Sequence, residues 1–259
     1  MSFATANVRG VLNRTVILVA LASLVACPPT DESEVRRAMK DSADALARAR
    51  AAGDAEGVEK ASMQGLEAVE QFAAASDRQD RGFILTMARI ARALRERMDQ
   101  HDQRIQSFDA TGGCDVTMLK SRAAIDERRV LLRAVRTSAD ELCVDLGKVT
   151  ADVDREIRIA NLPAAEITAF KKGFDENARL PILTESCASQ VKLLAACDEQ
   201  IALLATHFGH WTVEDGLRFD DTVADDVTAD FDKLIARFDA EVANLDRLEK
   251  LRMAPAAPK

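Results

Sequence analysis

Apolar residues recur at steps of three and four over long stretches of this 259-residue chain, and this spacing restricts the fold more than any other feature. In an α-helix such residues share one face, which is buried against neighbouring helices. The longest line falls within residues 118–160, which as one unbroken helix would run about 65 Å, with Gly147 the expected place for a bend. The line comprises Met118, Ile125, Leu132, Val135, Ala139, Leu142, Leu146, Val149, Val153 and Ile157.

Shorter lines of the same kind predict six further helices, near residues 31–52, 55–76, 83–108, 164–178, 185–208 and 222–252. Expected breaks are Gly53, the pair Gly112-Gly113, Leu162-Pro163 and Leu180-Pro181-Ile182, since glycine and proline interrupt helices. A composition with 11 Gly, one Trp and no Tyr agrees with this reading. The chain is therefore expected to be all-α, an elongated multi-helix bundle or coiled-coil-like array.

The helix near 83–108 shows two faces. Its apolar line contains His101, which we expect to be a partly buried polar residue of the core. The opposite face is expected to be solvated, and it carries Arg89, Arg92, Arg95, Glu96 and Asp99.

Residues 211–219 break the helical pattern, because apolar residues alternate around an Asp-Gly pair, as in a β-hairpin. A two-residue loop would place Trp211 and Val213 opposite charged residues. A three-residue loop, 214–216, instead pairs Val213 with Leu217 and Trp211 with Phe219, which gives the hairpin one apolar face. We predict this second register, with the apolar face covering one end of the bundle before the last helix.

Residues 1–26 have the features of a secretion signal. Arg9 and Arg14 precede an apolar run over 16–26, and no acidic residue is present. The run is shorter than the roughly 20 residues that span a bilayer, and Pro28 and Pro29 stop the helix from continuing. An uncleaved N-terminal anchor helix is the alternative. The end of the run, Leu24-Val25-Ala26-Cys27, resembles the lipobox of bacterial lipoproteins.

The resemblance to bacterial lipoproteins implies cleavage before Cys27, a diacylglycerol on its thiol and acylation of the new amine. Each buried CH₂ of such chains contributes about 0.8 kcal/mol to membrane attachment. The lipid is the only group that we expect the protein to carry. The implied location is the cell envelope. Pro28 does not decide which of the two membranes holds the protein, and we prefer the outer membrane, facing the periplasm, to the inner membrane. The expected division is a signal peptide (1–26), a lipidated tether (27–30), a membrane-proximal helical hairpin (31–76), a main bundle (77–253) and a disordered tail (254–259).

A second resemblance involves the segment from Trp211 to Ile235, with its aromatic residues, Asp-Gly turn and following helix. Together with the signal, this segment is similar to helical envelope lipoproteins of unknown function from enteric bacteria. That family implies the architecture and no chemistry.

The charge of the chain restricts its partners. Residues 1–26 contain two of the 35 basic residues and none of the 43 acidic residues, so the remainder carries 33 minus 43, or −10. Such an acidic surface excludes nucleic acid and a broad electrostatic contact with anionic lipid. Membrane attachment is therefore expected to depend on the lipid anchor.

Apart from Cys27, the chain has Cys114, Cys143, Cys187 and Cys197, an even number that suggests disulfides in an oxidising compartment. Cys187 and Cys197 are expected on one helix, about 15 Å apart, which is too far for a bond. Cys114 and Cys143 are expected at opposite ends of a helical stretch. Bonds should therefore join the 114–143 region to the 187–197 helix. Either the first helix bends, or only one bond forms, with Cys143 the favoured member; buried free thiols are the alternative.

Catalytic and metal-binding patterns are few. His207 and His210, three residues apart, suit either two metal ligands or packing at a helix end, and packing is preferred because no third ligand is evident. We expect no metal site and no enzymatic activity. An acidic cluster at the start of the last helix is interpreted as favourable to the helix dipole; it comprises Asp220, Asp221, Asp225, Asp226 and Asp230.

Two functions are therefore considered. The first is a non-enzymatic, membrane-anchored scaffold or regulator that contacts an envelope protein through exposed helical surfaces. The alternative is a small-ligand or lipid-binding protein with a cavity near Phe170, Phe174, Phe208 and Trp211.

Overall fold

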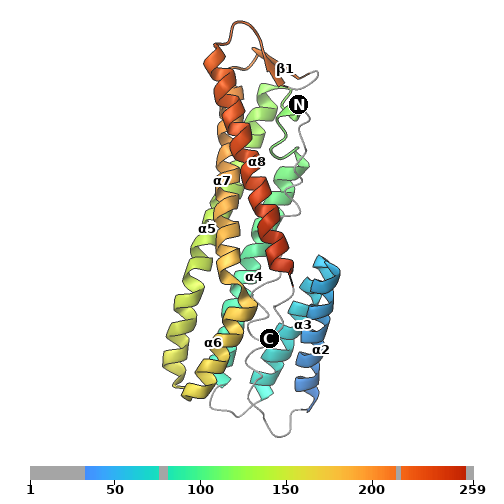
Figure 1. Cartoon of the computed structure of the whole chain (residues 1–259), viewed down its shortest axis with the longest axis vertical. Coiled ribbons are helices and arrows are strands. Elements are labelled where there is room, and N and C mark those ends of the chain that lie inside the picture. The colour runs from blue at the N-terminus through green and yellow to red at the C-terminus, as the bar shows by residue number, and fades with distance from the viewer. Residues whose placement is uncertain (1–32, 76–80, 214–216, 255–259) are drawn as a thin grey trace. The chain divides into compact units, whose positions relative to one another are not determined.

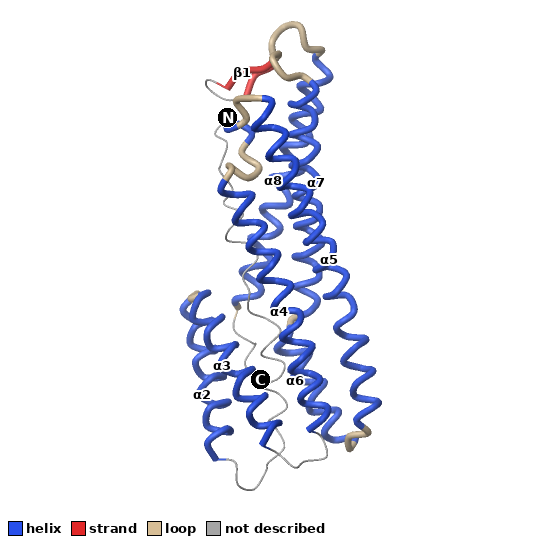
Figure 2. Tube along the Cα trace, turned by 180° about the vertical axis from the view of Figure 1, so that it is seen from behind, coloured by secondary structure: helices blue, strands red, loops and turns tan. Residues whose placement is uncertain are grey.

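The computed structural model describes residues 33–75, 81–213 and 217–254. Over these residues the protein is almost entirely helical, with one two-stranded antiparallel hairpin before the last helix (Figures 1 and 2). The predicted all-α fold is confirmed. The elements, in chain order, are α2 (Ser33–Ala52), α3 (Ala55–Ala75), α4 (Arg81–Ala110), the 3-10 turn η3 (Val116–Met118), α5 (Arg122–Ala160), α6 (Ala164–Ala178), α7 (Leu180–Thr206), β1 (Trp211–Val213), β2 (Leu217–Phe219) and α8 (Asp225–Met253).

Helices α2 and α3 form a helical hairpin. Gly53 adopts φ +66°, which ends α2, and the Asp54 side chain accepts a hydrogen bond from the Gly57 N–H (2.9 Å) at the start of α3. The two helices approach closely through small residues: Ser42 donates to the Ala61 carbonyl (2.6 Å), and a Cβ on Gly65 would lie 2.7 Å from the Ser42 hydroxyl.

The connection between α4 and α5 departs from the prediction. Gly112 and Gly113 adopt positive φ and end α4 as expected, but residues 116–118 form a 3-10 turn. Helix α5 begins only at Arg122, and the side chain of Met118 is 53% exposed instead of lying on the core line. From there α5 continues through Gly147 without interruption. The rest of its predicted line, from Ile125 to Ile157, is buried.

The predicted break at residues 180–182 is wrong. Arg179 adopts φ +48° and ends α6, and α7 begins at once with Leu180. Pro181 lies in the first turn of α7, where a helix needs no N–H donor, so proline is tolerated there. The guanidinium of Arg179 donates to three backbone carbonyls at the end of α8, those of Leu251, Arg252 and Ala254.

The hairpin has the predicted register, with Trp211 opposite Phe219 and Val213 opposite Leu217. Its apolar face packs on the neighbouring helices: the Trp211 indole N–H donates to the Leu204 carbonyl (3.0 Å), and the Phe219 ring meets the Phe231 ring edge-on at 5.7 Å. The predicted loop, 214–216, lies outside the described residues.

The chain divides into two compact units. The first unit consists of Gln100–Cys143 and Glu185–Glu249, and the second unit contains the described residues of Asn13–Asp99, Val144–Thr184 and Lys250–Lys259. The units cut across helices, and the hairpin of α2 and α3 belongs to the same unit as the first part of α4. The expected signal (1–26), the tether (27–30) and residues 255–259 of the tail lie outside the described residues.

Each unit has its own core. In the first unit, buried residues of α4, α5, α7 and α8 join the linker residues Val116 and Leu119 in one apolar cluster. In the second unit, Phe170 meets Phe83 edge-on and stacks with Phe174. Arg95, expected to be solvated, is buried in this unit and forms an ion pair with Asp99 (3.1 Å).

Candidate functional site

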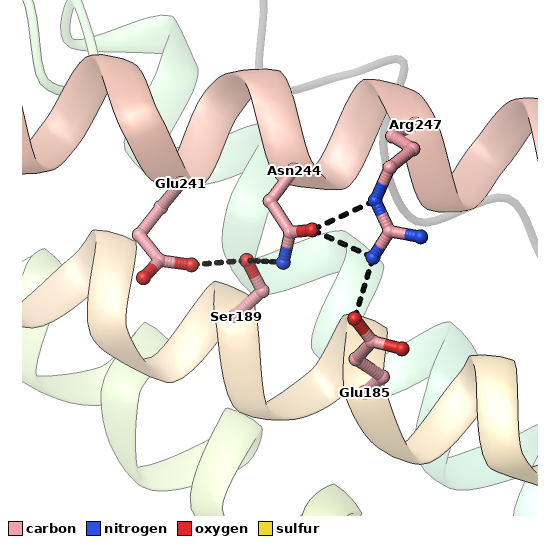
Figure 3. Close-up of polar contacts among 5 residues, drawn as sticks. All are labelled: Glu185, Ser189, Glu241, Asn244 and Arg247. Atoms are coloured by element: carbon pink, nitrogen blue, oxygen red, sulfur yellow. Dashed lines mark hydrogen bonds and ion pairs between the residues drawn. The ribbon is translucent and has the colours of Figure 1, made fainter.

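Polar side chains connect α7 and α8 within the first unit (Figure 3). Ser189 of α7 donates its hydroxyl hydrogen to Glu241 of α8 and accepts a hydrogen bond from the Asn244 amide (3.1 Å). Arg247 then donates to the Asn244 side-chain oxygen (2.8 Å) and to Glu185 of α7 (2.5 Å). These five residues, which we call the α7–α8 network, alternate donors and acceptors across the two helices.

The chemistry of this network is structural. Ser189 donates its hydroxyl hydrogen to a carboxylate, but the residue is only 2% exposed, so a substrate cannot reach the oxygen. A serine nucleophile needs a base that accepts its proton and an open approach to the reacting atom. The α7–α8 network instead fixes the rotation of α8 against α7.

A second polar group lies in the core of the same unit, around His101 of α4. Its Nδ1 lies 2.7 Å from the Ser138 hydroxyl of α5, and that hydroxyl donates to the Val135 carbonyl (2.8 Å). Because a hydroxyl has one hydrogen, the imidazole Nδ1–H must be the donor to Ser138. Burial lowers the pKa of His101 from 6.5 to about 4; the Gln190 side chain raises it and Arg104 lowers it, each by less. His101 is therefore a neutral core residue at pH 7.

Sequence reasoning placed His101 on the core line but missed its partners. Ser138 lies three residues after Val135 and four before Leu142, which places it on the buried line of α5. Gln190 has the same spacing between Cys187 and Leu194. Ser138 and Gln190, polar residues at core positions of two helices, could therefore have been predicted as neighbours of a buried histidine. The spacing alone does not say which positions of different helices face each other.

Two disulfides fasten the first unit. Cys114 is bonded to Cys197 and Cys143 to Cys187, with Cα–Cα distances of 5.7 and 5.6 Å. Both bonds join the 114–143 region to α7. The expectation that only one bond could form without a bend in the first helix is wrong, because Cys114 lies in the linker before α5 rather than on the same helix as Cys143.

The buried guanidinium of Arg128 positions this linker. It donates to the Asp115 carbonyl (2.5 Å) and to the Thr111 carbonyl. The linker, and Cys114 with it, therefore lies beside Arg128 instead of continuing away from the start of α5. A Cβ on Gly112 would lie 2.7 Å from the same guanidinium, so a residue without a side chain is needed there.

We compared the sequence and the structure with those of known proteins. No family model, curated protein or solved structure matches this chain. The candidate site is therefore assigned from geometry alone.

The two other histidines lie at the end of α7 and in the following turn. The His207 ring packs edge-on against Phe219 (6.3 Å), and Nδ1 of His210 lies 2.9 Å from the Thr222 hydroxyl and 3.2 Å from Asp220. Among the residues that the structure describes, no three His, Cys, Asp or Glu side chains are grouped so that they could hold a metal ion.

The predicted acidic cluster lies in α8 and just ahead of it. Asp225 and Asp226 lie in the first turn of α8 and Asp230 pairs with Lys233, while Asp220 and Asp221 are exposed ahead of the helix. The four aromatic residues expected around one cavity belong to two units: Phe170 and Phe174 to the second unit, Phe208 and Trp211 to the first.

Cys27 lies outside the described residues. Within the described ranges no helix has the length and apolar character needed to cross a membrane.

Proposed function

We propose that this protein is a non-enzymatic lipoprotein of the bacterial envelope, anchored by lipid on Cys27, that acts as a scaffold or regulator through contacts with an envelope protein. The outer membrane, facing the periplasm, is the proposed location. The protein contacts the membrane through its acyl chains and not through surface charge. Nucleic acid is not among its proposed partners.

The use of cysteine supports the export part of the proposal. Four of the five cysteines pair with one another, which leaves Cys27 of the lipobox-like sequence as the fifth. Disulfides persist in the periplasm and outside the cell, and are rare in a reducing cytosol. Two disulfides and one further cysteine available for lipidation are what we expect of an exported lipoprotein.

The observation that carries the scaffold part is an apolar surface on α5. Val130, Val144 and Ile159 are 64%, 54% and 70% exposed, whereas most large apolar side chains of α5 are buried. Val144 and Ile159 belong to the same unit and are 15 residues apart, which places them about 60° apart around the axis of α5, on one side of the helix. An exposed apolar side of a helix can bind a partner by packing into a groove of that partner.

The anchor is tested by Cys27→Ser in cells fed an alkyne-labelled fatty acid. The parent protein should incorporate the label, lose its first 26 residues and sediment with membranes. The variant should lose the label and leave the membrane fraction. A variant that stays membrane-bound at full length would rule out the lipid anchor.

The scaffold is tested by a photo-crosslinking amino acid at Val144 in the membrane-bound protein, followed by mass spectrometry. We expect one reproducible envelope protein, and we expect Ile159→Asp to abolish the crosslink. The matched control carries the crosslinker at Thr150, an exposed position on another side of α5 in the same unit. Equal capture at Val144 and Thr150, or capture of this chain alone, would contradict a specific partner on α5.

A further inference from the structure

The two disulfides are nested in the sequence. In chain order the cysteines are Cys114, Cys143, Cys187 and Cys197, and the structure joins the first to the fourth and the second to the third. Pairing in order of appearance would instead join Cys114 to Cys143 and Cys187 to Cys197. Neither of these bonds is present in the structure.

The unfolded chain favours the wrong pairs. Cys187 is 10 residues from Cys197 but 44 from Cys143, and the entropy of loop closure favours the shorter loop about nine-fold. Cys143 is 29 residues from Cys114, a loop that also closes more easily than the 44-residue loop, by about two-fold. During N-terminus-first export, Cys114 and Cys143 also emerge before Cys187. Rapid oxidation therefore forms consecutive pairs.

Folding cannot accept these pairs. Cys187 and Cys197 lie ten residues apart on the single helix α7, about 15 Å along its axis. Cys114 and Cys143 lie beside these two positions of α7, with Cα–Cα distances of 5.7 and 5.6 Å to Cys197 and Cys187, so they too are separated by roughly 15 Å. A disulfide requires Cα atoms within roughly 7 Å. A chain with consecutive bonds must break them before the first unit can form.

We infer that this protein is a substrate of a thiol–disulfide isomerase, an inference that rests on the proposed export. A thiolate of the reduced isomerase attacks the Cys187–Cys197 bond, forms a mixed disulfide with one sulfur and releases the other as a thiolate. Thiolate exchange then moves the bonds to Cys143–Cys187 and Cys114–Cys197, and the last exchange releases the isomerase thiolate. The number of disulfides in the chain is unchanged, so this step needs no further oxidant.

The test is oxidative refolding of the full chain with Cys27→Ser, which leaves four thiols. The denatured, reduced protein is diluted into a buffer of oxidised and reduced glutathione, which oxidises the chain and keeps the isomerase thiol available. Samples are trapped with acid and alkylated at intervals, and digested with trypsin for mass spectrometry. Trypsin cuts at Lys192, between Cys187 and Cys197, so the linked peptides identify each pair. In the earliest samples the Cys187–Cys197 bond should exceed the Cys143–Cys187 bond about nine-fold. A catalytic amount of reduced disulfide isomerase should shorten conversion to the nested pairs from hours to minutes.

The matched control is the same chain with Cys114→Ser and Cys197→Ser, in which only the native Cys143–Cys187 bond can form. The isomerase should not change its rate of bond formation, whether or not this variant folds fully. Nested pairs that form first, at a rate that the isomerase leaves unchanged in the four-cysteine chain, would overturn the inference. Failure of the proposed export gives a different result: the protein in cells would be found fully reduced, while the refolding result would stand.

Discussion

His101 links the stability of the first unit to pH. Its pKa is about 4 in the folded protein and about 6.5 in the unfolded chain, so between these values only the unfolded chain binds the proton. We therefore expect the free energy of unfolding to fall as pH drops from 7 to 4, by up to about 3 kcal/mol from this group. Urea unfolding at several pH values, followed by circular dichroism, measures the slope. In His101→Gln this share of the slope should vanish; an unchanged slope would mean that other groups produce it.

The single side chain of Arg128 holds the linker between α4 and α5 in place. Burial lowers its pKa, but the guanidinium stays charged and donates to two backbone carbonyls. Arg128→Met removes a charged donor from both carbonyls and leaves Asp115 only the Met118 N–H (3.3 Å), so we expect a loss of about 1–3 kcal/mol in the free energy of unfolding. Hydrogen exchange of the amides in 111–121 should rise at the same time. Arg133→Met, at an exposed position one to two turns later, is the matched control and should change neither quantity.

At the scale of elements, the α7–α8 network is open to a double-mutant cycle. Ser189→Ala and Asn244→Ala each remove one partner of a hydrogen bond between the helices. We expect a coupling energy of about 0.5–1.5 kcal/mol from thermal unfolding of the two single variants and the double variant. The control cycle is the exposed ion pair of Asp230 and Lys233 on α8, whose coupling should be smaller, about 0.3–0.5 kcal/mol. Equal couplings in both cycles would mean that the network is no more than a surface contact.

The elements also show what the sequence predicts and where it stops. The buried line of α5 and the pairing of Trp211 with Phe219 follow from periodicity, which depends only on local geometry. The start of α5 does not, because the 3-10 turn is held by Arg128, a contact between segments. Arg95 was expected in solvent for a similar reason: its burial depends on which helices pack around it. For the same reason, spacing alone left the disulfide pairing open.

At the scale of the whole molecule, both disulfides belong to the first unit, while the hairpin of α2 and α3 belongs to the second. The bonds close 83 and 44 residues, and chain entropy gives each a stabilisation of about 4–4.5 kcal/mol. Reduction with dithiothreitol should therefore lower hydrogen-exchange protection in Gln100–Cys143 and Glu185–Glu249, and leave the amides near Val58 and Leu66 of α3 unchanged. Cys143→Ser with Cys187→Ser should reproduce part of the loss without reductant. If α3 loses protection as strongly as the first unit, the two units unfold as one, and the disulfides stabilise the entire chain.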